Sequence, residues 1–145
     1  MITKTRHVGL IVRNLAKSKK FYGKMLGLKL KKELYEHGKY FNTLIGLKNS
    51  QAKVVKINLP DSTYIELIEF IKPKSQIKPK IEKFDKLKQM HICFTVKDID
   101  NYFKRLKKNK IKFISPPLKS DFDPVSTCFF LDPDFNYVQL VEDKN

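Results

Sequence analysis

The chain contains an internal repeat, the feature that most restricts what it can fold into. Residues 7–15, His-Val-Gly-Leu-Ile-Val-Arg-Asn-Leu, align with residues 91–99, His-Ile-Cys-Phe-Thr-Val-Lys-Asp-Ile, at an offset of 84. A second alignment, at an offset of 73, pairs residues 59–69 with residues 132–142. Such self-similarity indicates two copies of one supersecondary unit. An insertion in the middle of the first copy explains why the two offsets differ by 11 residues.

Each copy is predicted to begin with a strand and to continue as a helix. Asn14 and Asp98 follow the first strands and are expected to cap the helices, because their side chains accept hydrogen bonds from first-turn N–H groups. Apolar residues within 15–26 fall on one helical face, and Gly27 stands where a helix end favours positive φ. In the second copy the same pattern ends at Asn109.

The remainder of each copy is predicted to be β-strand. Pro-Asp-Ser-Thr in the first copy and Pro-Asp-Phe-Asn in the second supply the turn before the last strand. The predicted strands cover residues 53–59 and 64–71 in the first copy, and 112–115, 126–131 and 137–141 in the second.

Residues 72–88 are rich in Lys and Pro and separate the two copies. We interpret them as a linker with a helical turn around 81–87. The chain is then one domain over 1–145, made of an N-terminal module (1–71), this linker and a C-terminal module (89–145).

The formal charge of +15 raises nucleic acid as a partner, since clustered basic residues neutralise phosphates. Only three of the 30 basic residues are Arg, however, and base-edge and bidentate phosphate recognition favours the guanidinium group. The lysines are also scattered along the chain. We therefore expect a solvated surface and no nucleic-acid partner.

No apolar run approaches the roughly 20 residues that span a membrane, and residues 1–4 lack the apolar stretch of a signal peptide. A cytoplasmic protein without a membrane partner is expected. Cys93 and Cys128 lie in apolar, strand-like runs. They are predicted to be reduced core residues and not a disulfide, because cytosolic thiols stay reduced.

Four polar residues occupy matched places in the apolar strands: His7 matches His91, and Glu66 matches Gln139. A polar side chain among apolar neighbours lies at an edge, at a site, or in a pair. Modules related by a pseudo-two-fold axis would bring two imidazole nitrogens and two side-chain oxygens together. Such a set suits one divalent ion, Zn, Ni, Co, Mn or Fe(II), with positions left for water or substrate. A single His at the start of a strand is usually structural, so this hypothesis depends on the matched set.

The chain resembles the vicinal oxygen chelate superfamily in four segments that span nearly its whole length: His-Val-Gly-Leu-Ile-Val, Ile-Glu-Leu-Ile-Glu, His-Ile-Cys-Phe-Thr-Val and Asp-Pro-Asp-Phe-Asn-Tyr-Val-Gln-Leu-Val-Glu. Members include glyoxalase I, methylmalonyl-CoA epimerase, extradiol dioxygenases, fosfomycin-resistance enzymes and bleomycin-binding proteins. With the repeat, the resemblance implies an α+β fold in which two βαβββ modules form an incomplete mixed-sheet barrel. It does not imply a substrate, because one fold hosts many functions.

The metal ligands of the superfamily fall on His7, Glu66, His91 and Gln139. Glyoxalase I usually has Glu at the last of these positions. The order His, Glu, His, Gln instead matches the epimerase set with its two modules exchanged. Phe135 also departs from the family, whose turn generally has Gly there. Because Phe avoids positive φ, we expect this turn to be of a different type.

The leading hypothesis is a metal-dependent enzyme, a glyoxalase-like lyase or an isomerase or epimerase, acting on a small oxygen-chelating substrate. Glu66 would be the base that moves a proton beside the chelated oxygens. Tyr64 and Tyr137 share strand faces with Glu66 and Gln139 and are predicted to bind substrate, although aromatic residues at such places are core fillers at least as often. The basic surface favours an anionic substrate.

Two alternatives stay open: a non-catalytic drug-binding or metabolite-binding protein of the same fold, and a dioxygenase. Bleomycin binders present acidic, Trp-containing clefts, whereas this chain is cationic and has no Trp. A dioxygenase would use two His and one Glu, with the Glu expected where Gln139 stands. The chain is expected to form a homodimer, with its site closed within one chain or across the dimer.

Overall fold

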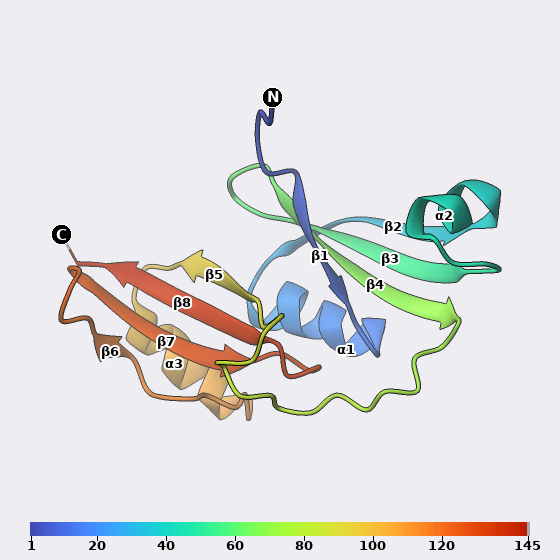
Figure 1. The fold of residues 1–145 in the computed structure, drawn as a ribbon. Helices are drawn as coiled ribbons and strands as arrows, with labels where there is room; N and C mark the ends of the chain where they lie inside the picture. Colours follow the sequence, from blue (N-terminus) through green and yellow to red (C-terminus); the bar gives the residue numbers. More distant parts are fainter. Residues whose placement is uncertain (145) are drawn as a thin grey trace. The chain divides into compact units, whose positions relative to one another are not determined.

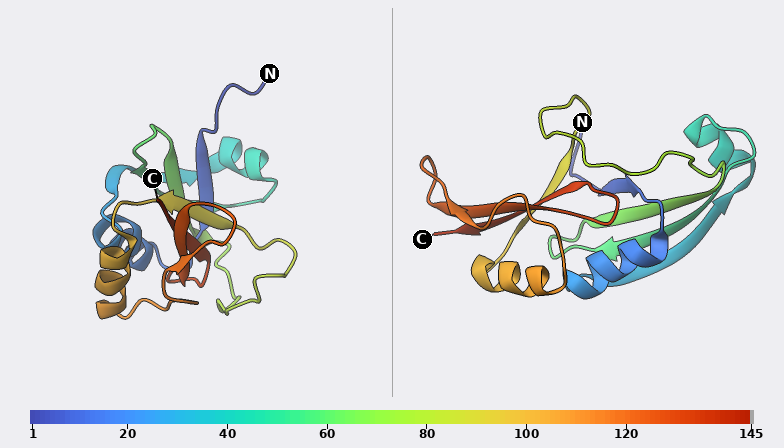
Figure 2. Two further views of the ribbon diagram at one scale, coloured as in Figure 1. Left: turned by 90° about the vertical axis from the view of Figure 1, so that its left-hand side faces the viewer. Right: turned by 90° about the horizontal axis from the view of Figure 1, so that it is seen from below.

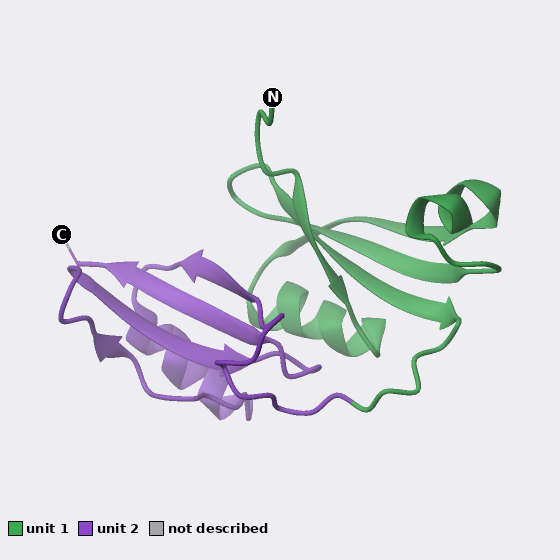
Figure 3. Cartoon of the chain, viewed as in Figure 1, with its two compact units in different colours: residues 1–78 green, residues 79–145 purple. Residues whose placement is uncertain are grey.

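The computed structural model describes residues 1–144, which form two compact units (Figure 3). The first unit is Met1–Lys78 and the second begins at Pro79, so the division falls inside the predicted linker. Each unit has a core of apolar side chains that are at most 1% exposed. These are Tyr22, Ala52, Val55, Ile57, Ile65 and Leu67 in unit 1, and Ile99, Leu106, Phe130, Val138 and Leu140 in unit 2.

Unit 1 is a mixed four-stranded sheet with the helix α1 packed on β4 and β3 (Figure 1). Its elements are β1 (His7–Ile11), α1 (Leu15–Lys19), the π-helical η1 (Lys20–Met25), β2 (Lys29–His37), α2 (Gly38–Ile45), β3 (Gln51–Asn58) and β4 (Tyr64–Lys72). The strand order is β1-β4-β3-β2. β1 runs parallel to β4, and the other neighbours are antiparallel.

Unit 2 repeats this topology. Its elements are β5 (His91–Thr95), α3 (Ile99–Lys108), β6 (Leu118–Lys119), β7 (Val125–Leu131) and β8 (Tyr137–Asp143). The strand order is β5-β8-β7-β6, with β5 parallel to β8, and α3 packs on β8 at one face of the sheet (Figure 2). The prediction of an α+β fold with two βαβββ modules is confirmed, and both sheets are open.

The two predicted caps are present. The Asn14 carboxamide oxygen accepts a hydrogen bond of 2.9 Å from the Lys17 N–H, and Asp98 accepts one of 3.0 Å from the Asn101 N–H. Gly27 has φ of 79°, as expected after a helix, and Asn109 ends α3. The helix predicted over 15–26 is correct in extent, but its second half is the π-helix η1.

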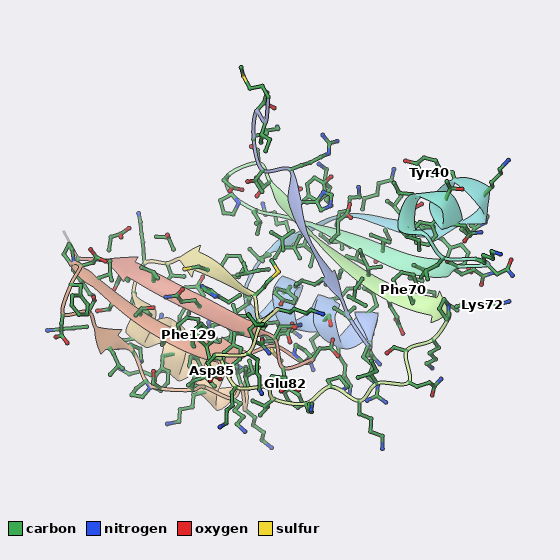
Figure 4. The ribbon with its side chains drawn as sticks, in the orientation of Figure 1. Tyr40, Phe70, Lys72, Glu82, Asp85 and Phe129 are labelled. Carbon is green, nitrogen blue, oxygen red and sulfur yellow. The ribbon has the colours of Figure 1, made fainter. Side chains whose placement is uncertain are left out.

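The insertion predicted in the first copy corresponds to α2 and to a longer second strand. β2 has nine residues, whereas β6 at the same place in unit 2 has two. The Phe41 ring of α2 stacks on Phe70 of β4 at 6.2 Å between centroids. On the other side of α2, Tyr40 is 77% exposed (Figure 4). One face of this helix therefore covers the end of the sheet.

The prediction of a strand over residues 112–115 is wrong. They contribute one isolated bridge, Phe113 to Phe130, and the edge strand lies at Leu118–Lys119 instead. Around the predicted helical turn at 81–87 the structure has two single hydrogen-bonded turns and no longer helix: the Lys86 and Gln89 N–H groups donate to the carbonyls of Lys83 and Lys86. Among residues 1–144, no helix has the length and apolar character needed to cross a membrane.

The turn before β8 also differs from expectation. Phe135 has φ of 65°, so the prediction that it avoids positive φ is wrong. The buried Asp132 carboxylate stabilises this turn, accepting hydrogen bonds of 2.8–2.9 Å from the Asp134 and Asn136 N–H groups and from the Asn136 side chain. At the matching place in unit 1, Ser62 has φ of 67°. Both modules therefore use the same turn, each with a non-glycine residue in the left-handed region.

We expect Ser62→Gly to stabilise unit 1 by about 0.5–1 kcal/mol, because glycine adopts positive φ without the Cβ clash. Ser62 is exposed, so the substitution removes little packing. The midpoint of thermal unfolding should rise by about 2 °C. Ser62→Ala retains the Cβ and should give no increase. An unchanged or lower midpoint for Ser62→Gly would show that the turn is not strained.

Candidate functional site

In unit 1, β1 and β4 bring two of the predicted ligands together. The parallel register sets Gly9 opposite Glu66, and His7 lies two residues before Gly9, on the same face of the sheet. The His7 Nε2 lies 3.4 Å from the Glu66 Oε2. The side chains of His7 and Glu66 are 35% and 15% exposed, so the pair is accessible but partly shielded from solvent.

A lysine of β3 completes this cluster. Lys56 stands opposite Glu66 in the antiparallel register, and its Nζ lies 2.8 Å from the Glu66 Oε1. The hydrogen bond to Glu66 is the main cause that raises the pKa of Lys56 above its usual value of 10.5, so this side chain is a cation at neutral pH. Glu66 thus has a cation at one carboxylate oxygen and an imidazole nitrogen near the other.

Tyr64 lies beneath the cluster. Its ring stacks on His7 at 5.1 Å between centroids, and the Nζ atoms of Lys31 and Lys56 lie 5.2 and 5.0 Å from the ring centroid. Tyr64 itself is only 8% exposed. Its predicted role in substrate binding stays a prediction; in the structure it supports His7 and two lysines.

In unit 2 the matching residues have different surroundings. Gln139 donates a hydrogen bond of 2.9 Å to the Thr127 hydroxyl, which itself donates to the Leu140 carbonyl. His91 contacts two aromatic rings, Phe129 at 5.2 Å and Phe84 at 5.7 Å between centroids. Phe129 occupies the position in unit 2 that corresponds to Lys56 in unit 1.

The segment before β5 packs onto this part of unit 2. The Phe84 ring meets Tyr137 edge-on at 5.0 Å, and the Tyr137 hydroxyl donates a hydrogen bond of 2.8 Å to the Glu82 carbonyl (Glu82 and Phe129 are labelled in Figure 4). Tyr137 is 6% exposed, like Tyr64. These contacts place Phe84 against the ring of His91.

The unit 1 pair suits a divalent ion in its donors and spacing. Imidazole and carboxylate ligands lie about 2.0–2.2 Å from a shared ion, so their donor atoms lie about 3 Å apart, close to the 3.4 Å seen here. Lys56 opposes such an ion, because its ammonium group holds the other Glu66 oxygen. Within residues 1–144 of either unit, no three His, Cys, Asp or Glu side chains form a metal-binding group.

A groove of about 230 Å³ lies elsewhere in unit 1, near the carboxyl ends of β1 and β4. Its walls include Ile11, Arg13, Leu47, Phe70 and Lys74, and none of the predicted ligands lines it. The predicted site therefore does not coincide with this groove.

Lys56 is the member of this cluster that sequence reasoning missed. It lies in β3 between the buried residues Val55 and Ile57, and the hairpin that joins β3 to β4 pairs Asn58 with Tyr64. Counting back along this register sets Lys56 opposite Glu66. The signal was therefore available from the turn and the strand pattern.

Both cysteines are free, which confirms that Cys93 and Cys128 form no disulfide in the described chain. The prediction that both are core residues is wrong for Cys93, which lies on the exposed face of β5 with His91 and Thr95, whereas Ile92 and Phe94 on the other face are less exposed. Cys128 is 2% exposed, and burial raises the pKa of its thiol to about 11. Partial desolvation also raises the pKa of the Cys93 thiol.

This difference predicts selective alkylation. At pH 8 iodoacetamide should modify Cys93 in the folded protein, whereas Cys128 should react only after unfolding, because a buried thiol of raised pKa presents little thiolate. Peptide mass spectrometry before and after denaturation measures both sites. Equal reaction of the two thiols in the folded protein would contradict the burial of Cys128.

Residues 4–140 match the sequence profile of the Glyoxalase/Bleomycin resistance protein/Dioxygenase superfamily. The chain therefore belongs to this superfamily, which confirms the resemblance stated from its sequence motifs. No curated protein sequence gives a significant match.

Solved structures share the fold at low sequence identity. A glyoxalase family protein from Bacillus cereus is 20% identical, with a TM-score of 0.88 over 100% of this chain and 97% of its own. Glyoxalase I from Leishmania major is 20% identical, with a TM-score of 0.67 over 99% and 88%. The fosfomycin resistance protein FosX from Listeria monocytogenes is 19% identical, with a TM-score of 0.66 over 98% and 94%. These likenesses establish the fold.

Proposed function

We propose that the chain is a metal-dependent, glyoxalase-like lyase or an isomerase or epimerase that moves a proton on a small, oxygen-chelating, anionic substrate. The observation that supports this most directly is the His7–Glu66 pair, whose donor atoms lie 3.4 Å apart on neighbouring strands of a superfamily member. His91 and Gln139 as the remaining ligands stay a prediction from the sequence. The homodimer and the cytoplasmic location also stay predictions.

In this mechanism Glu66 is the base. A bound divalent ion would act as a Lewis acid toward two neighbouring substrate oxygens and so make the adjacent C–H bond more acidic. A Glu66 carboxylate oxygen takes that proton as the C–H bond breaks, and then returns it to the same carbon or to its neighbour. Tyr64 keeps the His7 ring in place by stacking.

The proposed anionic substrate is supported by the charges around this pair. Lys31 and Lys56 both direct their ammonium groups at the Tyr64 ring, beside one carboxylate, Glu66. The whole chain carries a formal charge of +15. Such a field attracts an anionic metabolite and accelerates its encounter with the site.

One observation favours a second candidate, a non-catalytic small-molecule binding protein of the same fold. The Lys56–Glu66 ion pair neutralises the carboxylate without any metal. In that case the carboxylate would have a structural role, and substrate turnover would be absent.

The test begins with chelator-treated protein. It is titrated with Ni²⁺, Co²⁺, Zn²⁺, Mn²⁺ and Fe²⁺ by calorimetry and assayed with hemithioacetals and acyl-CoA epimers. One bound ion per chain, with turnover that chelation removes and metal restores, supports the proposed enzyme. Metal binding without turnover favours the binding protein. Absence of metal binding contradicts the proposed function.

A further inference from the structure

The two modules differ in charge at one pair of equivalent positions. Lys56 stands opposite Glu66 in unit 1, and Phe129 stands opposite Gln139 in unit 2. The first module therefore combines a carboxylate with a cation, and the second combines a neutral amide with an aromatic ring. Neither the repeat nor the superfamily assignment accounts for this lysine.

Lys56 is built into the site and is not a surface lysine that happens to lie nearby. Its side chain is 24% exposed and that of Glu66 is 15% exposed, with 2.8 Å between the Nζ and the Oε1. The same Nζ lies 5.0 Å from the Tyr64 ring centroid, so the ammonium has a second partner. Two neighbouring strands thus place this cation against the carboxylate predicted to bind the metal.

The ammonium of Lys56 would keep one partner if its contact with Glu66 weakened, because it already lies over the Tyr64 ring. If a divalent ion binds the carboxylate, the like charges of the ion and Lys56 repel each other strongly at this distance. This repulsion weakens the contact between Lys56 and Glu66, while the Tyr64 face can continue to hold the ammonium. The ion and the ammonium thus compete for the same carboxylate.

We propose that Lys56 is an intrinsic cation that competes with divalent metal ions for Glu66 and thereby lowers the metal affinity of the site. This inference rests on the proposed function, because it assumes that Glu66 is a metal ligand. Displacing Lys56 costs the same for every divalent ion, so it lowers their affinities by a similar factor, and the ions that still bind at low concentration are those, such as Ni²⁺ and Zn²⁺, that bind carboxylate and imidazole strongly.

The test compares Zn²⁺ and Mn²⁺ affinities of chelator-treated variants by calorimetry. Lys56→Met removes the cation and should tighten the binding of Zn²⁺ and of Mn²⁺ by at least about tenfold each. Lys56→Arg retains the charge and should bind like the wild type. Lys53→Met is the matched control, because it removes the same charge from an exposed position on the other face of β3. It should change the affinity by less than about twofold.

Thermal unfolding of the metal-free variants checks that each is folded, and Lys56→Gln replaces Lys56→Met if the latter is not. Unchanged or weaker metal binding in the folded neutral variant, beside a wild type that binds metal, overturns the inference and leaves the proposed function standing. A gain of the same size in Lys53→Met also overturns it, because the effect would then be one of net charge. Absence of binding in every variant overturns both.

Discussion

Glu66→Gln should leave a protein that binds metal but turns over substrate about 10²–10⁴ times more slowly, the usual effect of losing a general base. The amide keeps an oxygen that can accept from Lys56, and it is close in size to the carboxylate, so the strand pairing around it should persist. It cannot accept the substrate proton. Turnover and metal content are measured on the same samples, with whichever hemithioacetal or acyl-CoA epimer the wild type converts.

Glu36→Gln is the matched control for this experiment. Glu36 lies on β2 and is paired with Ala52 in the register, outside the His7–Glu66–Lys56 cluster. Its replacement should leave turnover unchanged. Full activity in Glu66→Gln would show that Glu66 is not the base, even if it is a metal ligand. Loss of both metal and activity would show that its charge is required for metal binding.

The modular fold could be predicted because the same unit occurs twice in the sequence. A strand, a capped helix and a turn recur at matched offsets, and the local physics of each is strong. Asn14 and Asp98 satisfy first-turn N–H groups, and Gly27 adopts positive φ. Such short-range signals do not depend on how distant parts of the chain pack.

The edge strands and the turn at Phe135 could not be predicted in the same way. Seven of the nine residues of β2 are exposed, so its sequence lacks the apolar alternation of a half-buried strand. β6 pairs through only two residues. Phe135 adopts positive φ in a turn that Asp132, three residues earlier, stabilises with several hydrogen bonds, which the preference of Phe alone does not reveal. The edge strands depend on pairing with distant residues, whereas this turn depends on near neighbours in the chain.

The candidate site, too, could be predicted only in part. His7 and Glu66 were found from their matched places, and the structure brings them to 3.4 Å. Lys56 was missed because it does not recur in the second copy, where Phe129 stands. The contact of Phe84 with His91 joins the segment before β5 to the strand itself, and no periodic pattern in the sequence encodes it.

Replacing His7 or His91 should lower metal affinity much more than stability, and this would distinguish both histidines from structural residues. His7→Ala removes a nitrogen beside Glu66, and His91→Ala removes its predicted counterpart. Each should weaken metal binding by at least about 100-fold, since even an outer partner of a ligand contributes about 10–100-fold. Neither should greatly lower the unfolding midpoint of the metal-free protein, because His7 is a partly exposed side chain and His91 is exposed.

His37→Ala is the control, because His37 ends β2 and contacts Tyr35 at 5.3 Å, apart from the predicted ligands. Calorimetric titration with Ni²⁺, Co²⁺, Zn²⁺ and Mn²⁺ should give wild-type affinity for this variant. A loss confined to His7→Ala would limit the metal ligands to unit 1 and exclude His91. Wild-type affinity in both His7→Ala and His91→Ala would make the two residues structural. The stacking of His7 on Tyr64 and the aromatic contacts of His91 would then be their main roles.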